Sequence, residues 1–60
     1  FRPDLIVCNV VIVEIKSVER WDDVFLAQML TYLRLTGRRV GLILNFNRPV
    51  LTTGIKRVAL

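Results

Sequence analysis

The sequence contains no histidine and a single cysteine, Cys8, among its 60 residues. One thiol cannot form a disulfide within the chain, which fits a reducing compartment such as the cytoplasm. The same shortage argues against zinc, which is held mainly by clustered cysteine and histidine. No apolar run reaches the roughly 18 residues that span a bilayer, and no secretion signal is visible. We therefore expect a cytoplasmic protein with no membrane partner, in which any metal has oxygen ligands.

Length and composition limit what the chain can do alone. A domain of this size buries only about 60% of the surface that its unfolded chain exposes. Yet 53% of the residues are hydrophobic, and the mean hydropathy is +0.50. That is more apolar surface than so small a domain can bury alone, so we expect either a homo-oligomer or the remainder of a larger domain. Because the chain begins at Phe1 rather than Met, the part missing from such a domain would be N-terminal. The net charge of +4 fits a polyanionic partner such as nucleic acid.

The first third of the chain predicts a β-hairpin. Valine and isoleucine dominate residues 5–8 and 10–16, and Asn9 between them tolerates the positive φ of a turn. Side chains alternate between the two faces of a strand, so one face of this hairpin should be wholly apolar and should form the core. That face consists of Leu5, Val7, Val11, Val13 and Ile15.

A helix and a further strand follow. Asp22 or Asp23 can cap a helix over residues 24–36, and Gly37 is a suitable residue to end it. Residues 40–46 are almost continuously apolar, as expected of a strand buried on both faces. The strand–helix–strand unit should form a right-handed crossover that places its two strands parallel.

The chain closes with a loop containing Pro49 and Gly54 and then an edge strand over residues 55–60. The charges of Lys56 and Arg57 would discourage this edge from pairing with another sheet. We therefore predict an α/β fold, a small mixed sheet with an antiparallel hairpin, a crossover helix, a parallel strand and an edge strand. It would form a single partial domain over residues 1–60.

The hairpin register decides where the charged side chains lie. A three-residue turn would pair Val7 with Val11, which keeps the apolar face together and places Asp4 opposite Glu14. Lys16 then shares their face at the open end of the hairpin. Two carboxylates, with water or phosphate oxygens, can hold Mg²⁺. The simpler alternatives are that Asp4 is a turn residue and that Glu14 and Lys16 form an exposed ion pair.

These residues also match a known motif. Pro3-Asp4, followed after nine residues by Glu14-Ile15-Lys16, resembles the signature of the PD-(D/E)xK, restriction-endonuclease-like nuclease superfamily. Gln28 and Tyr32 resemble the Q-x-x-x-Y motif of its RecB-like branch. The stretches "VVIVEIKSVE", "AQMLTYLRLTG" and "VGLILNF" are more closely similar to the small bacterial GxxExxY proteins, so the resemblance covers nearly the whole chain.

The resemblance implies a function and a role for each matched residue. Asp4, Glu14 and the backbone carbonyl of Ile15 would bind Mg²⁺, or Mn²⁺ in its place. Lys16 would orient the attacking water and stabilise charge on the scissile phosphate. Gln28 and Tyr32 would support the site. The expected activity is Mg²⁺-dependent phosphodiester hydrolysis of nucleic acid. The fold would be a truncated restriction-endonuclease-like core.

Several residues have simpler interpretations. Gln28 can be a hydrogen-bonded interface residue, and Tyr32 a core ring with its hydroxyl at the surface. Arg38 and Arg39 are either a solvated turn or contacts to nucleic-acid phosphates. The superfamily usually completes its metal site with a glutamate from an upstream helix, which this chain lacks. The alternative function is therefore a catalytically inactive module that retains the nuclease fold and either assembles with itself or binds nucleic acid.

Overall fold

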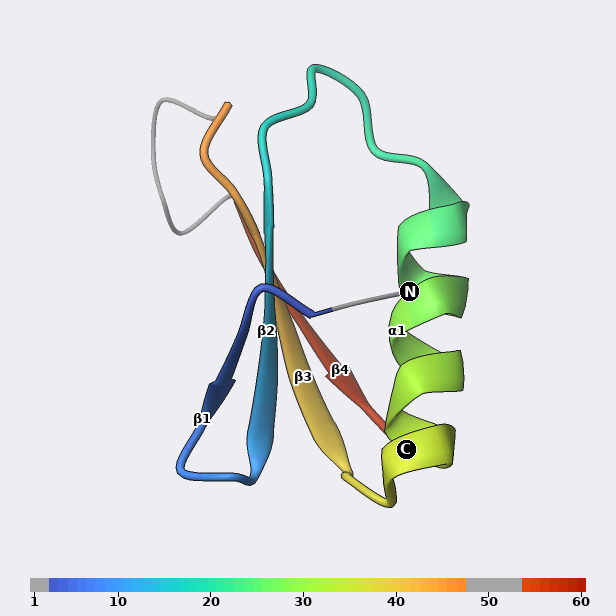
Figure 1. Ribbon diagram of the computed structural model, residues 1–60. Coiled ribbons are helices and arrows are strands. Elements are labelled where there is room, and N and C mark those ends of the chain that lie inside the picture. The colour runs from blue at the N-terminus through green and yellow to red at the C-terminus, as the bar shows by residue number, and fades with distance from the viewer. Residues whose placement is uncertain (1–2, 48–53) are drawn as a thin grey trace.

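The described part of the chain forms a four-stranded sheet with one helix against one of its faces (Figure 1). The computed structural model describes residues 3–47 and 54–60. Pro49 and most of the predicted loop around it lie outside the described residues. In chain order the elements are β1 (Leu5–Val7), β2 (Val11–Lys16), α1 (Asp23–Thr36), β3 (Val40–Asn45) and β4 (Ile55–Ala59).

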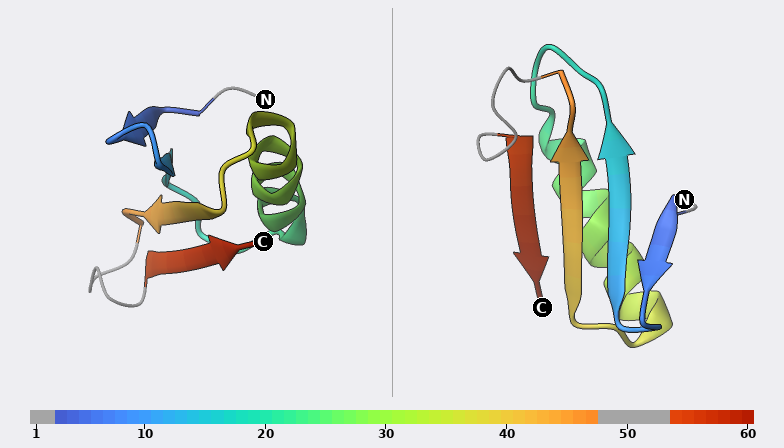
Figure 2. Two further views of the ribbon diagram at one scale, coloured as in Figure 1. Left: turned by 90° about the horizontal axis from the view of Figure 1, so that it is seen from below. Right: turned by 90° about the vertical axis from the view of Figure 1, so that its left-hand side faces the viewer.

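The strands lie in sequence order, β1-β2-β3-β4. Strand β2 pairs antiparallel with β1 and parallel with β3, and β3 pairs antiparallel with β4. In Figure 2 (right) helix α1 lies behind the sheet and β3 lies to the left of β2 with both strands pointing up, which is a right-handed crossover. The predicted α/β class, the mixed sheet and the crossover are confirmed.

The hairpin has the register that its apolar pattern predicts. Leu5 pairs with Val13 and Val7 with Val11, and the amide of Val10 donates to the carbonyl of Val7 at 3.0 Å. Asn9 has a φ of 57°, as expected of a turn residue. Cys8 also has a positive φ, 54°, which the sequence did not indicate.

Local signals at both ends set the limits of α1. The side chain of Asp22 accepts a hydrogen bond from the amide of Val24 at 2.9 Å and so caps the first turn. Gly37 ends the helix with a φ of 72°, a left-handed conformation that costs glycine little. Among the described residues, no helix is both long enough and apolar enough to cross a membrane.

The core lies on the sheet face that faces α1. It is the face with the charged residues, so the prediction that the wholly apolar face forms the core is wrong. Gly41 allows the close approach of the helix, because a Cβ there would overlap the sulfur of Met29. The reason for the reversal is handedness: a right-handed crossover fixes which face the helix covers, whatever the pattern of the strands. The buried hydrophobic cluster consists of Ile12, Met29, Leu33, Ile43 and Val58.

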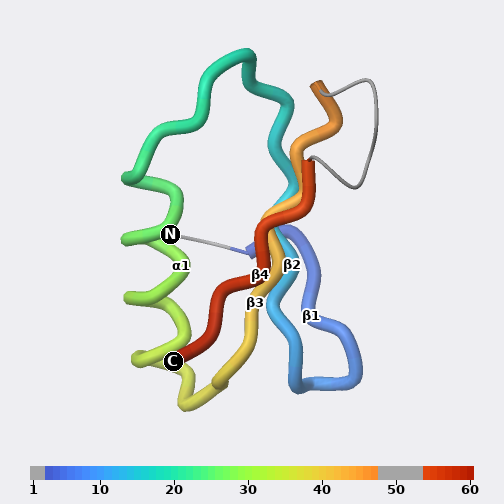
Figure 3. Tube along the Cα trace, turned by 180° about the vertical axis from the view of Figure 1, so that it is seen from behind, coloured from blue at the N-terminus to red at the C-terminus, as the bar shows by residue number. Residues whose placement is uncertain are grey.

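The other face of the sheet is aliphatic and uncovered by any element among residues 3–47 and 54–60 (Figure 3). Leu5 is 51% exposed and Ile15 is 47% exposed. Strand β3 alternates between buried and half-buried positions, so the expectation of burial on both faces is also wrong. We call this surface the open face; its side chains are those of Leu5, Val7, Val11, Val13, Ile15, Val40, Leu42, Leu44, Ile55, Arg57 and Ala59.

Candidate functional site

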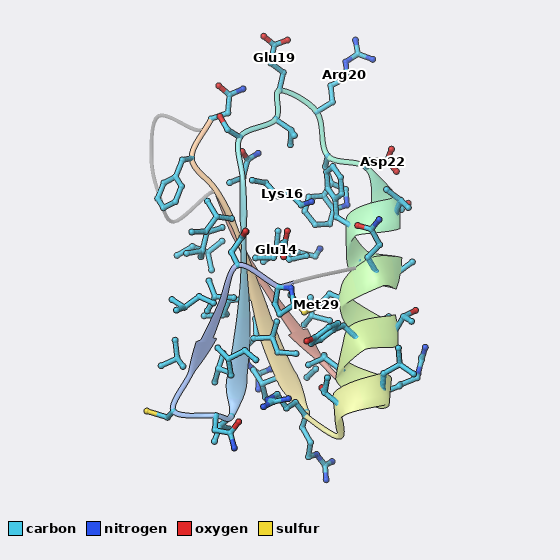
Figure 4. All side chains as sticks on the ribbon, viewed as in Figure 1. Glu14, Lys16, Glu19, Arg20, Asp22 and Met29 are labelled. Atoms are coloured by element: carbon cyan, nitrogen blue, oxygen red, sulfur yellow. The ribbon has the colours of Figure 1, made fainter. Side chains whose placement is uncertain are left out.

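The charged side chains of β2 lie on the covered face, at the end of the strand nearest the start of α1. Figure 4 shows Glu14 and Lys16 between the sheet and the helix. They alternate with Ile15, so both point to the same side as the buried Ile12. The sheet therefore brings a carboxylate and an ammonium into a space bounded by the first turns of α1.

Glu14 is the most unusual residue of this group. It is only 9% exposed, and its Oε2 atom is buried without a hydrogen-bond partner among the described residues. Its Oε1 lies 3.6 Å from the Nζ atom of Lys16. Burial raises the pKa of Glu14, the nearby charge of Asp4 raises it further, and Lys16 opposes both effects. A buried carboxylate oxygen without a partner is costly, which makes Glu14 a candidate for binding a cation.

Asp4 lies just before β1, at the exposed end of the hairpin. Continuing the β1–β2 register by one residue places it opposite Glu14, as predicted. Its Oδ2 atom accepts a hydrogen bond from the amide of Ile15 at 2.7 Å. This bond ties the Asp4 side chain to the strand that carries Glu14, in place of the backbone pairing that ends at Leu5.

Aromatic rings border the site, a feature that the sequence analysis missed. The Nζ atom of Lys16 lies 4.5 Å from the centre of the Phe25 ring on α1. Trp21 packs edge-to-face on Phe25, with ring centres 5.4 Å apart. The indole of Trp21 also donates to the Oδ1 atom of Asp23 at 3.1 Å. These contacts hold the ammonium of Lys16 between a carboxylate and an aromatic ring.

Asn45 fixes the segment that leads from the site to the helix. Its buried side chain accepts a bond from the amide of Val18 at 3.1 Å and donates to the carbonyl of Val18 at 3.0 Å. It also accepts from the amide of Asn47 at 3.1 Å. The two bonds to Val18 form only because the end of β3 lies beside the segment that follows β2, so the sequence alone does not reveal them.

Two of the remaining predicted residues lie on α1, and the two arginines lie at the opposite end of the sheet. Gln28 is exposed on α1, and Tyr32 is half-buried and packs against the core cluster. Arg38 donates to the backbone and side-chain oxygens of Asn9, at the opposite end of β2 from Lys16. Arg39 is exposed beside it, and its carbonyl accepts a bond from the amide of Leu60 at 3.0 Å. The structure therefore brings Asp4, Glu14 and Lys16 together but not the arginines.

The described side chains around Glu14 do not form a closed metal site. Within the described parts of the chain, no group of three or more acidic, cysteine or histidine side chains could enclose an ion. Asp4 and Glu14 supply two carboxylates. The Oε2 atom of Glu14 has no hydrogen-bond partner among the described residues and is therefore available to coordinate an ion. Mg²⁺ is commonly held by one or two carboxylates together with waters and substrate phosphates. These residues fit such an open site.

Comparison with known proteins agrees with this chemistry. No curated protein and no solved structure matches the chain. The model of one protein family, the PD-(D/E)XK nuclease superfamily, matches residues 1–58. That match covers nearly the whole chain, including both carboxylates and the lysine. The chain therefore belongs to the PD-(D/E)XK nuclease superfamily.

Proposed function

We propose that the protein binds a divalent metal ion, Mg²⁺ or Mn²⁺, and hydrolyses phosphodiester bonds in nucleic acid. The observation that carries this proposal is the buried, unpartnered Oε2 atom of Glu14 beside Asp4 and Lys16. Members of the superfamily typically use divalent metal ions. We also propose that the chain belongs to the GxxExxY proteins within it and acts in a bacterial cytoplasm.

Each residue of the cluster has a distinct task in this scheme. Asp4, Glu14 and the carbonyl of Ile15 hold the ion. When bound, such an ion polarises a phosphoryl oxygen and makes a bound water more acidic. Lys16 orients the attacking water and places its positive charge near the scissile phosphate, where negative charge develops. Its contacts with Glu14 and Phe25 limit the positions that its ammonium can take.

The outer residues act around this centre. Gln28 and Tyr32 are four residues apart on α1 and so share one side of the helix, from which they support the site. Arg38 and Arg39 lie at the other end of the sheet and would contact phosphates of a strand that extends past the hairpin turn. Their contribution should be electrostatic and should weaken as salt is added.

Calorimetric titration of Mn²⁺ and Mg²⁺ tests the metal site. Wild type should release heat that saturates with the ion, and Glu14→Ala should not. Glu19→Ala is a matched control, because Glu19 is exposed in the loop before α1 and should leave the heats unchanged. Identical heats for wild type and Glu14→Ala would refute the site. Cleavage of a labelled DNA or RNA oligonucleotide, lost in Lys16→Met, then tests the reaction.

A second candidate function, self-assembly without catalysis, is favoured by the open face. This surface is aliphatic and nearly free of charge, with Arg57 as its one charged side chain among the described residues. Two copies could pack it face to face as two sheets of a sandwich. Sedimentation should then find dimers in wild type and monomers in Ile15→Lys. Val24→Lys, an equally exposed residue of α1, is the control. A wild-type monomer at high concentration would exclude this assembly.

A further inference from the structure

Strand β4 contributes a lysine to the covered face, level with the candidate metal site. Glu14 pairs with Ile43 across β2 and β3, and Ile43 pairs with Lys56 across β3 and β4. All three therefore lie in one row across the sheet, on the same face. Unlike Lys16, Lys56 is exposed, and among the described residues it forms no ion pair. Its charge is available to a ligand.

Lys56 also ends a second row, in which two aromatic rings lie between two lysines. Its Nζ atom lies 5.7 Å from the centre of the Trp21 ring. Trp21 contacts Phe25 edge-to-face, and Phe25 carries Lys16 at 4.5 Å. The row therefore runs from the free lysine of β4, over two rings at the start of α1, to the lysine beside Glu14.

The chemistry of this row matches an unpaired nucleotide. Proteins bind single-stranded nucleic acid with cations along the backbone and aromatic rings on which bases stack. A distance of 5.7 Å is near the outer limit of about 6 Å for a cation over a ring, so Lys56 is held only weakly there. A phosphate can draw the ammonium away and leave part of the half-buried Trp21 ring to a base.

We propose that Lys56 and Trp21 form a binding subsite for single-stranded nucleic acid next to the Glu14 site. Lys56 contacts a backbone phosphate, and Trp21 stacks on the adjoining base. The inference rests on the proposed function and adds to it the strandedness of the substrate, because the faces of bases inside a duplex are covered by the neighbouring base pairs and cannot stack on a side chain.

A structural role for Lys56 is the competing explanation, since charges on edge strands prevent aggregation. The neighbouring Arg57 separates the two explanations. It has the same charge and the same strand, but it points to the open face, paired with Leu42. Protection of the edge strand against aggregation would involve both Lys56 and Arg57, whereas of these two residues the proposed subsite involves only Lys56.

Fluorescence anisotropy of a labelled oligothymidylate, in buffer with EDTA to prevent cleavage, tests the subsite. Lys56→Gln should weaken binding about five- to tenfold and lower the salt slope by about 0.7, the share of one phosphate on a single strand. Arg57→Gln should stay within about twofold of wild type, because its side chain is on the other face. Equal losses in the two variants would overturn the subsite and indicate diffuse charge attraction.

Trp21 provides a direct signal because it is the one tryptophan of the chain. Its emission should be quenched by oligothymidylate and not by an abasic oligomer of equal length, since only a base can stack. Trp21→Leu should weaken binding roughly five- to a hundredfold, and Trp21→Phe, which keeps a ring and preserves the packing on Phe25, should recover part of it. Circular dichroism of each variant checks that the fold is intact. Equal quenching by the two oligomers would refute stacking.

The outcomes separate this inference from the proposed function. Metal heats that depend on Glu14, or cleavage that depends on Lys16, combined with identical binding by Lys56→Gln and Arg57→Gln, would overturn the subsite alone. Absence of binding by wild type, with intact metal heats, would also overturn the subsite and leave the metal site in place. Absence of binding, metal heats and cleavage together would overturn both.

Discussion

The two faces of the sheet differ in burial, and their composition alone would predict the opposite assignment of core and exposed face. The covered face carries Glu14, Lys16 and Lys56 and yet contains the core, whereas the open face is almost entirely aliphatic and, apart from Val13, half-buried or exposed. The difference teaches that burial follows the helix, and the helix follows the handedness of the crossover. The charged residues then lie at the end of the covered face, where Glu14 is largely withdrawn from water. The charged groups and the buried hydrophobic cluster therefore share one side of the sheet.

The largest expected effect is on the free energy of unfolding, and it is measured by truncating the same residue type, isoleucine, on each of the two faces. Ile12→Ala removes a fully buried side chain and should lower the free energy of unfolding by about 2–5 kcal/mol. Ile15→Ala, on the same strand but 47% exposed, should cost about 1 kcal/mol. Urea denaturation measures both. Because a chain this small is marginally stable, the milder pair Ile12→Val and Ile15→Val serves if Ile12→Ala does not fold.

Similar costs for the two isoleucine variants would contradict the assignment of the faces. A cost for Ile15→Ala that grows with protein concentration would instead mean that a second copy covers the open face, because only association depends on concentration.

The next largest effect comes from the hydrogen bonds by which Asn45 holds the segment after β2. Asn45→Ala should lower the free energy of unfolding by about 1–3 kcal/mol, because it leaves the partly buried amide and carbonyl of Val18 without their partner. Asn47→Ala, in the exposed turn that follows, should change it by less than about 0.5 kcal/mol. Thermal unfolding by circular dichroism compares the two. Equal shifts would show that the Asn45 bonds do not hold the loop.

The smallest effect is a pH dependence at Glu14. Its pKa in the folded protein is raised above 4.5, chiefly by burial, so folding favours the protonated form. That contribution is fully present below pH 4.5 and is lost as the pH rises through the raised pKa. Glu14→Gln, which cannot ionise, should lack it and should therefore be more stable than wild type above that pKa.

Denaturation of both proteins in EDTA at a series of pH values measures the difference in stability. This difference should grow in favour of Glu14→Gln as the pH rises, and a constant difference would contradict the burial of a charged carboxylate. Added Mn²⁺ should then stabilise wild type at neutral pH and leave Glu14→Gln unaffected, since the metal binds the ionised carboxylate.

Local signals predicted the elements and the hairpin register. Asp22 and Gly37 mark the ends of α1 because capping depends on residues next to each other in the chain. The register followed because slipping by one residue would split the apolar set of the hairpin. The same register places Asp4 opposite Glu14, so the carboxylates of the candidate site could be found from the sequence.

The tertiary structure alone decided which face is buried and what surrounds Lys16. Alternation along a strand defines two faces but not which one a helix covers, because that depends on the direction of the crossover. The contacts of Lys16 with Phe25, of Lys56 with Trp21 and of Asn45 with Val18 join segments far apart in the chain. Such contacts exist only once the chain has folded, so sequence periodicity and local propensity do not predict them.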